Sequence, residues 1–511
     1  MFPLALAIPF VLFFTFIFLL STSILFTKRQ QDDLKRPPGP PSLPIIGNLH
    51  MLGELPHRSL QLLAQKYGAI MSLKLGQIPA VVVSSHEAAE LFLKTHDTDF
   101  ASRPDVQASD PLSRGTKGLA FAAYGPYWRY VRKVCTLHLL SASRVQMLAP
   151  LRRAELGSNV KSLEKVAAAR EVVNLSEAVE DLIEETIYKM ILGRGKDDRF
   201  NLKGLIKDQL SLVGQFNMAD YVPWLGAFDF QGLTRNLRRN HKAIEDVLEK
   251  IVTEHEQAAR EQNEQNHNKD FMHTMLSLIH QPMELQDQQN HFLIDRDHLK
   301  VILIDMIFAA ADTSIVVIDF VFSELLRHPR VMKNLQKELQ NVIGMNRMVE
   351  EADLAKLSYL DMVIKETLRL HPPAPLIPRE NTEDVTVNGY YIKKKSRIIV
   401  NVWAIGRDPK VWSDDASMFY PERFVGSNID IQGQDFHLIP FGSGRRRCPG
   451  IQMGMTTVKL VVAQLVHCFS WELPSGMRPS DLDMNEKFGL TVPRIEPILA
   501  VPTYRLGTDN P

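Results

Sequence analysis

Residues 297–327 leave few choices for the fold, because the run "VILIDMIFAAADTSIVVIDFVFSELL" within them is apolar on nearly every side. A helix that is hydrophobic all round either crosses a membrane or lies inside a large protein. Asp305, Asp312 and Asp319 recur every seven residues in this run, and carboxylates are costly in lipid. The segment therefore predicts a long central helix inside a large domain, with the three acids on one side.

The size of the chain allows one large domain or two or three smaller ones, and its charge and cysteine count exclude several kinds of partner and site. Its 511 residues, 45% of them hydrophobic, are enough to bury an extensive core. The 59 basic and 59 acidic residues balance, so bulk electrostatics predict no nucleic-acid partner. Three cysteines, Cys135, Cys448 and Cys468, exclude a disulfide framework and a metal site built from four cysteines.

The N-terminus predicts a membrane anchor. Residues 1–27 contain no charged side chain, and their length exceeds the roughly 20 residues that span a bilayer as a helix. Basic residues follow from Lys28, which predicts that the rest of the chain faces the cytosol. Residues 28–48 then form a basic, proline-rich hinge that holds the body at a fixed angle to the membrane, and residues 49–511 form the catalytic domain.

The remaining pattern predicts a mainly α-helical fold with small β-sheets. Amphipathic periodicity indicates helices over 149–168, 234–262 and 352–370. Alternating or continuous apolar runs bounded by Gly and Pro indicate strands over 69–85 and 397–404.

The segment "FGSGRRRCPG", residues 441–450, places Cys448 in a basic, glycine-rich loop. Arg445, Arg446 and Arg447 are expected to lower the pKa of the thiol and favour the thiolate that binds metals. A basic loop that happens to contain a thiol is the plainer interpretation. If Cys448 does bind a metal, it does so almost alone, which favours a prosthetic group such as haem.

Three further patterns place polar or charged side chains close together on a helix. Asp312 and Thr313 lie in the apolar run, where Thr313 either bonds back to its own helix or joins Asp312 in proton delivery at a local opening of the helix. Glu366 and Arg369 are three residues apart, as in an ordinary surface ion pair. Trp128 and Arg132, four residues apart, put an indole and a guanidinium on one helix face.

Taken in chain order, these segments resemble the cytochrome P-450 family of haem-thiolate monooxygenases, and most of all its plant microsomal members. The resemblance extends from Pro37 to about Thr503. The haem-binding pattern of the family, Phe-x-x-Gly-x-Arg-x-Cys-x-Gly, is matched in full by Phe441, Gly444, Arg446, Cys448 and Gly450. The resemblance implies haem b as the cofactor, with Cys448 as the axial thiolate ligand of its iron.

The resemblance also implies roles for the other patterns. Trp128, Arg132 and Arg446, with Arg379 as a further candidate, contact the haem propionates. Glu366, Arg369 and Arg423 of "PERF" form a buried ion network. Asp312 and Thr313 match the acid–alcohol pair for oxygen activation, although Ala310 stands where many members have glycine.

The implied function is the hydroxylation of a lipophilic plant metabolite (a terpenoid, phenolic or oxime) with O2 and electrons from NADPH. A membrane-bound NADPH–cytochrome reductase would supply the electrons to an enzyme anchored once in the endoplasmic reticulum membrane. A haem-thiolate isomerase or dehydratase, or a haem-binding protein without turnover, remains as an alternative. The resemblance places the substrate pocket along the loop 105–123 and the residues Phe121, Phe216, Phe308, Ala309, Leu376 and Leu490.

Overall fold

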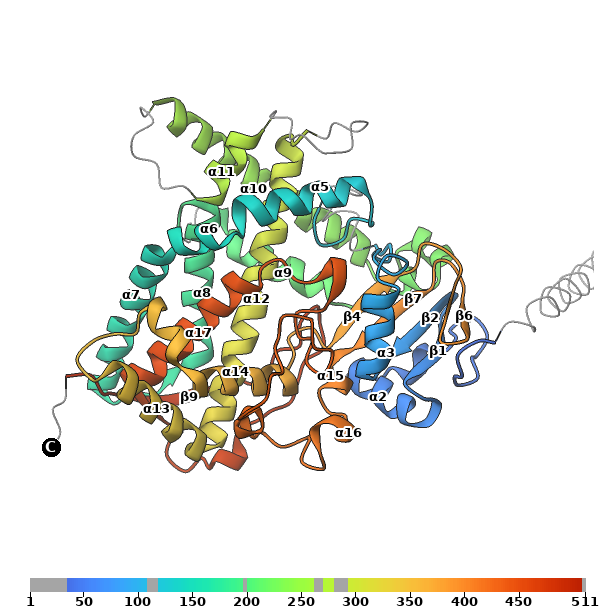
Figure 1. Cartoon of the computed structure of the whole chain (residues 1–511). Coiled ribbons are helices and arrows are strands. Elements are labelled where there is room, and N and C mark those ends of the chain that lie inside the picture. The colour runs from blue at the N-terminus through green and yellow to red at the C-terminus, as the bar shows by residue number, and fades with distance from the viewer. Residues whose placement is uncertain (1–34, 108–117, 196–199, 262–269, 280–292, 508–511) are drawn as a thin grey trace, which may run out of the picture.

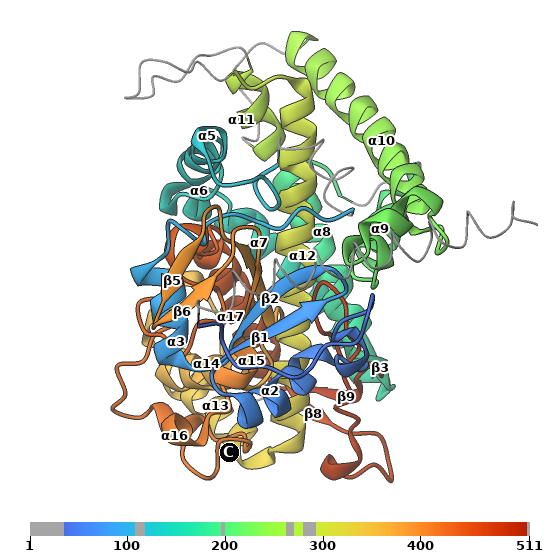
Figure 2. The ribbon, with the colours of Figure 1, turned by 90° about the vertical axis from the view of Figure 1, so that its right-hand side faces the viewer.

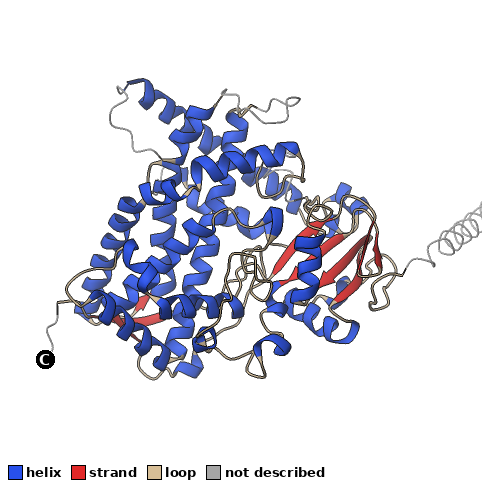
Figure 3. Ribbon diagram, viewed as in Figure 1, coloured by secondary structure: helices blue, strands red, loops and turns tan. Residues whose placement is uncertain are grey.

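Long helices build most of the molecule, and most of the strands gather at one end of it (Figures 1 and 3). The computed structural model describes residues 35–107, 118–195, 200–261, 270–279 and 293–507, so the predicted anchor over 1–27 lies outside the described residues. The helices are α2 (Pro56–Tyr67), α3 (His86–Glu90), α5 (Pro126–Val134), α6 (Ala142–Met147), α7 (Ala149–Ala169), α8 (Leu175–Leu192), α9 (Leu202–Val213), α10 (Leu233–Glu261), α11 (Phe271–Leu278), α12 (Arg296–Arg327), α13 (Pro329–Ile343), α14 (Ser358–Leu370), α15 (Val402–Ile405), α16 (Pro409–Trp412) and α17 (Ile451–Cys468).

Helix α12 runs through the middle of the helical body, as the sequence predicts (Figures 1 and 2). Asp295 caps its first turn, where its side chain accepts a hydrogen bond from the backbone N–H of His298. The helix packs against α8, α14 and α17, and most of its side chains are buried. Within the described residues it is the one helix long and apolar enough to cross a membrane, but 72% of its most apolar window is buried inside the fold.

The three acids of α12 each join the helix to a different distant segment. Asp305 accepts hydrogen bonds from the backbone N–H groups of Leu119 and Ala120, at 2.6 and 3.1 Å. Asp312 accepts one from Thr491, and Asp319 accepts one from Ser176 and pairs with Arg494. Because buried carboxylates need such partners, these contacts explain why an otherwise apolar helix carries three acids on one side.

The sheets are small. The four-stranded sheet has the order β1-β2-β7-β4, in which β2 and β7 are parallel and the other pairs are antiparallel. A three-stranded sheet has the order β3-β9-β8, and β5 pairs with β6. The strands are β1 (Ile70–Leu75), β2 (Ile78–Val83), β3 (Val173–Asn174), β4 (Leu376–Glu380), β5 (Val385–Val387), β6 (Tyr390–Ile392), β7 (Arg397–Asn401), β8 (Phe469–Glu472) and β9 (Leu499–Tyr504).

Two predicted elements differ from the structure. The helix expected over 352–370 is a short 3-10 helix, Glu351–Lys356, followed by α14 from Ser358. The strand expected over 397–404 ends at Asn401, whose side chain accepts a hydrogen bond from the Ala404 N–H and starts the short helix α15. In both cases polar side chains bond to nearby backbone N–H groups and start a new element: Glu350 and Asp353 at the 3-10 helix, and Asn401 at α15.

The described part of the proline-rich segment packs closely on β1. The carbonyl of Pro38 accepts a hydrogen bond from the Ser72 N–H at 2.8 Å, and the Asn48 N–H bonds to the carbonyl of Lys74 at 2.5 Å. A Cβ at Gly39 would lie 2.0 Å from the carbonyl oxygen of Ser72, so only glycine allows this approach. From residue 35 onward, the segment is therefore fixed to the sheet.

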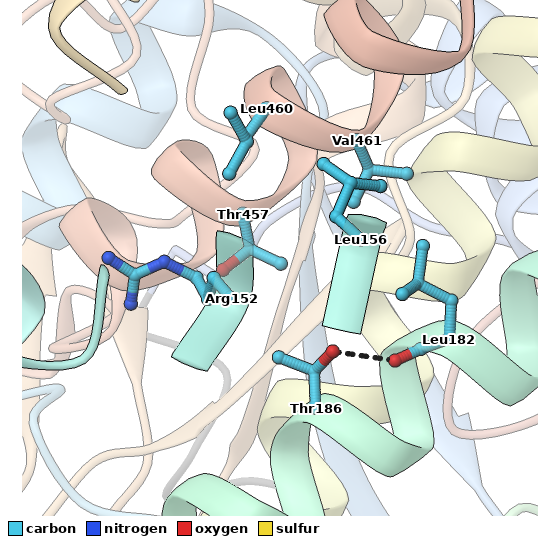
Figure 4. Close-up of a pocket in the computed structure, with 7 residues that line it drawn as sticks. All are labelled: Arg152, Leu156, Leu182, Thr186, Thr457, Leu460 and Val461. Carbon is cyan, nitrogen blue, oxygen red and sulfur yellow. Dashed lines mark hydrogen bonds between the residues drawn. The ribbon is translucent and has the colours of Figure 1, made fainter. Parts of the chain in front are cut away.

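A small cavity between α7, α8 and α17 belongs to the packing of the core (Figure 4). Its volume of about 10 Å³ is at the lower limit for a single water molecule. Leu156, Leu182, Leu460 and Val461 line it, and the Thr186 hydroxyl beside it bonds to the carbonyl of Leu182 in its own helix. Such a cavity cannot hold an organic substrate.

Candidate active site

Cys448 lies in a tight loop directly before α17. Its N–H donates to the carbonyl of Phe441 at 2.9 Å, which closes the loop on itself. Gly444 has φ +68, and a Cβ there would lie 2.3 Å from the carbonyl oxygen of Leu93 and 2.5 Å from Asp97. Glycine is therefore required at position 444 both for its backbone conformation and for its closeness to the 93–97 segment.

The electrostatics of Cys448 differ from the expectation based on its three arginine neighbours. Burial raises the pKa of the thiol, and the Gly450 N–H, Arg132 and Arg447 act in the opposite direction. Arg445 instead pairs with Asp97 at 2.9 Å, and Arg446 donates to the backbone carbonyls of Ala101 and Ala122. The expected lowering of the pKa by all three arginines is wrong, because of the three only Arg447 acts on the thiol in this direction, and burial outweighs it.

Four arginines form a cluster beside this loop: Arg103, Arg132, Arg379 and Arg446. Arg379 is fully buried, and its Nε and Nη1 have no hydrogen-bond partner among the described residues. Burial, followed by repulsion from Arg103 and Arg446, lowers its pKa. Burial also lowers the pKa of Arg446 to about 8, and its Nη1 is likewise buried without a partner in the described part of the chain. Within the described residues, the cluster therefore keeps guanidinium N–H groups available for an anion.

Arg103 is a member of this cluster that the sequence patterns do not single out. It donates to the carbonyls of Ala120 and Pro378, and burial lowers its pKa to about 10. The segment "ASRP" around it matches none of the sequence motifs of the site, so only its position in space identifies it.

Trp128 packs inside the cluster. The guanidinium of Arg446 lies 4.0 Å from its ring centroid, and that of Arg132 lies 5.3 Å away. The indole N–H donates to the carbonyl of Leu119 at 3.0 Å, and Arg132 donates to the carbonyl of Arg447 at 2.6 Å. The indole N–H is thus already used by the backbone, while its ring supports two of the four cations.

Glu366, Arg369 and Arg423 are in direct contact. Both oxygens of Glu366 accept hydrogen bonds from Arg369 at 2.8 Å, and Oε1 accepts a third from Arg423 at 2.8 Å. The side chains of Glu366 and Arg369 are completely buried. Arg369 also donates to the carbonyls of Gly406 and Ala416, so the network ties α14 to the chain that leads to the Cys448 loop.

Asp312 and Thr313 are adjacent in α12 but have separate partners. The Thr313 hydroxyl donates to the carbonyl of Ala309 at 2.7 Å, and Asp312 accepts a hydrogen bond from Thr491 at 2.6 Å. Helix α12 is continuous through 309–314, so the expected local opening is not present there. Ala309 is exposed and Asp312 and Thr313 are half-buried, although residues 305–308 before them are buried, so this part of the helix has an open side.

The predicted pocket residues come from five separate segments. Phe308 is buried and Ala309 exposed on α12, Leu376 begins β4, and Phe121 precedes α5, while residues 108–117 of the expected pocket loop lie outside the described residues. Phe216, which follows α9, is 45% exposed and stacks on Tyr221, and Leu490 is 43% exposed. A Cβ at Gly214 would lie 2.7 Å from the Leu490 nitrogen, which brings the end of α9 beside the Leu490 segment.

These residues fit a haem. Unpartnered guanidinium N–H groups of Arg379 and Arg446 suit the two carboxylates of the porphyrin, and a half-buried thiol lies beside them. No group of three or more His, Cys, Asp or Glu side chains suited to a metal occurs in the described ranges. A metal held by Cys448 would therefore take its other ligands from a prosthetic group.

Comparisons with known proteins agree with this geometry. The family model described as Cytochrome P450 matches residues 37–499. The chain is 54% identical to cytochrome P450 CYP736A12 of Panax ginseng over 99% of this chain and 100% of that protein. It is 40% identical to cytochrome P450 71AP13 of Prunus mume over 96% and 94% of the two chains, and 38% identical to salviol synthase of Salvia pomifera over 98% and 97%.

A solved structure supports the fold. A zebra fish cytochrome P450, determined with abiraterone, matches with a TM-score of 0.73 and 23% identity, over 88% of this chain and 100% of that one. The sequence-based assignment of family and fold is thereby confirmed, and with it the expected haem cofactor and monooxygenase class. The chain belongs to the cytochrome P450 family and is a haem-dependent monooxygenase of the plant type.

Proposed function

We propose that the protein hydroxylates a lipophilic plant specialised metabolite (a terpenoid, phenolic or oxime) at the membrane of the endoplasmic reticulum. In the balanced reaction, substrate R–H, O2, NADPH and one proton give R–OH, water and NADP⁺. A membrane-bound NADPH–cytochrome reductase passes the two electrons of NADPH to this chain. The observation that carries the proposal is the half-buried Cys448 thiol beside a cluster of arginines in which buried N–H groups of Arg379 and Arg446 have no partner among the described residues, in a chain of this family.

In this proposal Cys448 would ligate the haem iron through its sulfur, and Arg103, Arg132, Arg379 and Arg446 would hold the two propionates. The thiolate-bound haem supplies the activation of dioxygen. Gly444 and Gly450 allow the loop to lie close to its neighbours. The carbonyl of Phe441 accepts a hydrogen bond from the Cys448 N–H, and this bond closes the loop. Trp128 supports Arg132 and Arg446 through its ring.

Asp312 and Thr313 together order water and deliver protons in this proposal. Burial raises the pKa of Asp312, so its carboxyl takes up and releases a proton closer to neutral pH than an exposed aspartate does. The oxygen of Thr313 keeps its lone pairs free to order a water molecule, since its proton is used by the carbonyl of Ala309. An isomerase or dehydratase that uses no external protons would have no need of this pair.

The lining residues support a lipophilic substrate. Phe121, Phe216, Phe308, Ala309, Leu376 and Leu490 are all apolar. An apolar lining with a few polar groups is typical of sites for small organic ligands. The name of one relative, salviol synthase, shows that a chain of this type can act in the synthesis of a small organic compound.

Membrane attachment is proposed through residues 1–27, followed by the hinge 28–48 and the catalytic domain 49–511. An apolar patch, defined as Leu43, Ile45, Trp224, Phe228 and Phe230, supports this arrangement, because these side chains are 48–77% exposed. The two parts of the patch are neighbours, since the Gly76 N–H bonds to Ile46 and the Gln77 N–H bonds to Tyr221. Large exposed aromatic side chains are typical of surfaces that contact lipid.

The first experiment is the carbon monoxide difference spectrum of the dithionite-reduced protein in microsomes. A strongly red-shifted Soret band is expected, because a thiolate donates electron density to the iron. Cys448→Ala is expected to remove this band. Cys468→Ala is the matched control, because Cys468 is a buried cysteine bonded to Gln464 in the same helix.

Two results would contradict the proposal. A band at the position typical of histidine-ligated haem would show that Cys448 is not the axial ligand. A normal band without NADPH oxidation, in the presence of the reductase and a panel of lipophilic compounds, would favour a haem-binding protein without turnover. Thr313→Ala, which should divert electrons to peroxide while the spectrum is retained, then tests the acid–alcohol pair.

A further inference from the structure

The C-terminal hairpin 485–495 brings a hydroxyl group to Asp312. Thr491 is buried, and its Oγ1 donates to Oδ2 of Asp312 at 2.6 Å. The hairpin is defined by the pairing of Glu486 with Arg494 and by hydrogen bonds from Lys487 to Pro493 and from Ile495 to Asn485. A residue 179 positions away in sequence thus contacts the acid of the acid–alcohol pair.

Charged groups hold the base of the hairpin in place. Glu486 accepts a hydrogen bond from Arg58 at 2.7 Å and contacts His57 at 3.2 Å. His57 and Glu486 are buried and Arg58 is partly exposed, so the contact between His57 and Glu486 lies in a low-dielectric environment. Arg494 donates to Ser323 and lies 3.7 Å from Asp319, so the other strand of the hairpin is bound to α12. The hairpin is therefore attached to α2 on one side and to α12 on the other.

Two more contacts hold its tip. The Val492 N–H donates to the carbonyl of Pro373 at 3.0 Å. Gly214 at the end of α9 lies so close that a Cβ there would be 2.7 Å from the Leu490 nitrogen and 2.9 Å from Cα of Gly489. With base and tip both held, the Thr491 hydroxyl has a defined position relative to α12.

We propose that Thr491 is a positioning residue for Asp312: its hydroxyl orients the carboxyl group and leaves Oδ1 for water on the open side of α12. This inference rests on the proposed role of Asp312 in proton delivery. Thr491 donates a hydrogen bond and transfers no proton itself. The neighbouring Leu490 is a proposed pocket residue, so the same hairpin links the substrate pocket to the proton donor.

The groups around Asp312 determine the sign of the expected effect. Burial raises the pKa of its carboxyl, the hydrogen bond from Thr491 lowers it, and the negative charge of Glu180 on α8 raises it. Removal of the Thr491 hydroxyl therefore leaves two influences that both favour the protonated acid. The midpoint of its titration should move upward.

The test is a pH titration of the haem-loaded protein followed by infrared difference spectroscopy. Asp312→Asn identifies the C=O stretching band of the protonated carboxyl by its disappearance. Thr491→Val, which keeps the shape of the side chain, should shift the midpoint of that band to higher pH. Thr491→Ser, which keeps the hydroxyl, should titrate like the wild type.

Thr186→Val is the matched control, because the Thr186 hydroxyl is buried and bonds only to the carbonyl of Leu182 in α8. It should leave the Asp312 band unchanged. Thr491→Ala serves as a second variant if Thr491→Val fails to fold. If the Asp312 band of the folded Thr491→Val or Thr491→Ala protein titrates with the same midpoint as in the wild type, the inference is overturned.

The roles of Cys448 and Thr491 are tested separately. The carbon monoxide spectrum decides whether Cys448 ligates the iron, whatever happens at Asp312. The infrared titration decides whether Thr491 acts on Asp312, whatever the ligand of the iron. A thiolate spectrum with an unmoved Asp312 midpoint would retain the proposed function and reject the role of Thr491.

Discussion

At the scale of single residues, three consecutive arginines have three different partners. Arg445 pairs with Asp97, Arg446 donates to the carbonyls of Ala101 and Ala122, and Arg447 donates to the carbonyl of Gln432. Asp97 lies 348 positions away from Arg445 in sequence. Residue type therefore showed that this loop is basic, but the partner of each side chain depends on segments that the loop meets only in the folded protein.

Arg379 should affect the haem-free and the haem-loaded protein in opposite directions. A buried cation without a counter-ion is costly, so Arg379→Met should raise the unfolding midpoint of the haem-free protein. The same change should accelerate haem loss from the loaded protein, since a propionate loses its partner. Thermal unfolding and the rate of haem transfer to excess apomyoglobin measure the two effects.

Arg407→Met is the matched control for this prediction. Burial lowers the pKa of Arg407 to about 9, its Nη1 is buried without a partner among the described residues, and its guanidinium lies 3.9 Å from the ring centroid of Trp403. We expect this change to leave the rate of haem loss unaltered. Equal rates of haem loss in wild type and Arg379→Met would remove Arg379 from the propionate site.

At the scale of elements, α12 combines an apolar body with acids that each bond to another segment. Asp305 accepts hydrogen bonds from the backbone N–H groups of Leu119 and Ala120, which precede α5, and burial raises its pKa to about 6. The pKa of Asp305 is higher in the folded than in the unfolded protein. At pH values between these two pKa values, the folded protein therefore binds one proton more than the unfolded protein. The contribution of this group to stability is present below about pH 4 and is lost as the pH rises through about 6.

Asp305→Asn should therefore flatten the pH dependence of stability. Asparagine keeps an oxygen acceptor for the Leu119 or Ala120 N–H and does not titrate. The wild type should lose on the order of 3 kcal/mol of unfolding free energy between pH 4 and pH 7 through this group, and the variant should not. Urea unfolding at several pH values measures the difference, and parallel curves for the two proteins would contradict it.

The Cys448 loop is the second element whose conformation can be tested. Gly444→Ala should destabilise the protein by about 1–3 kcal/mol and weaken haem retention, because alanine is strained at φ +68 and its Cβ meets the carbonyl of Leu93. Gly157→Ala on α7 is the control, since its Cβ meets nothing within 4 Å and should stabilise the helix by up to about 1 kcal/mol. Unfolding midpoints and haem content check both variants, and a Gly444→Ala protein as stable as the wild type would show that the loop tolerates a side chain.

At the scale of the whole molecule, the apolar patch predicts a membrane contact that does not depend on residues 1–34. The protein without residues 1–34 should still float with phosphatidylcholine vesicles, because Trp224, Phe228 and Phe230 are 55–77% exposed. The triple change of these residues to serine should weaken the binding more than tenfold, since each aromatic side chain contributes about 1.5–3 kcal/mol when buried in an apolar phase. Met418→Ser, at a single exposed apolar residue, should bind like the truncated parent. No flotation of the truncated parent would mean that the patch does not contact lipid.

Regular periodicity made the long helices predictable. The segments expected over 149–168, 234–262 and 297–327 agree within one or two residues with α7, α10 and α12. The helix expected from residue 352 was wrong at its start, because Glu350 and Asp353 bond to backbone N–H groups and hold a 3-10 turn there. Periodicity reports which face of a segment is apolar, but a helix end depends on individual side-chain hydrogen bonds.

Local residue patterns were sufficient for the helical class, the buried central helix and the family, since the haem-loop pattern and the hydrophobic period each lie within one continuous segment. The folded chain alone showed that Arg103 belongs to the arginine cluster, that Asp312 and Thr313 have independent partners, and that Thr491 contacts Asp312. The reason is physical: burial and hydrogen bonding act between side chains that are close in space, and these partners are separated by up to several hundred residues along the chain. A short sequence segment encodes its own periodicity, but not the neighbours that folding brings to it.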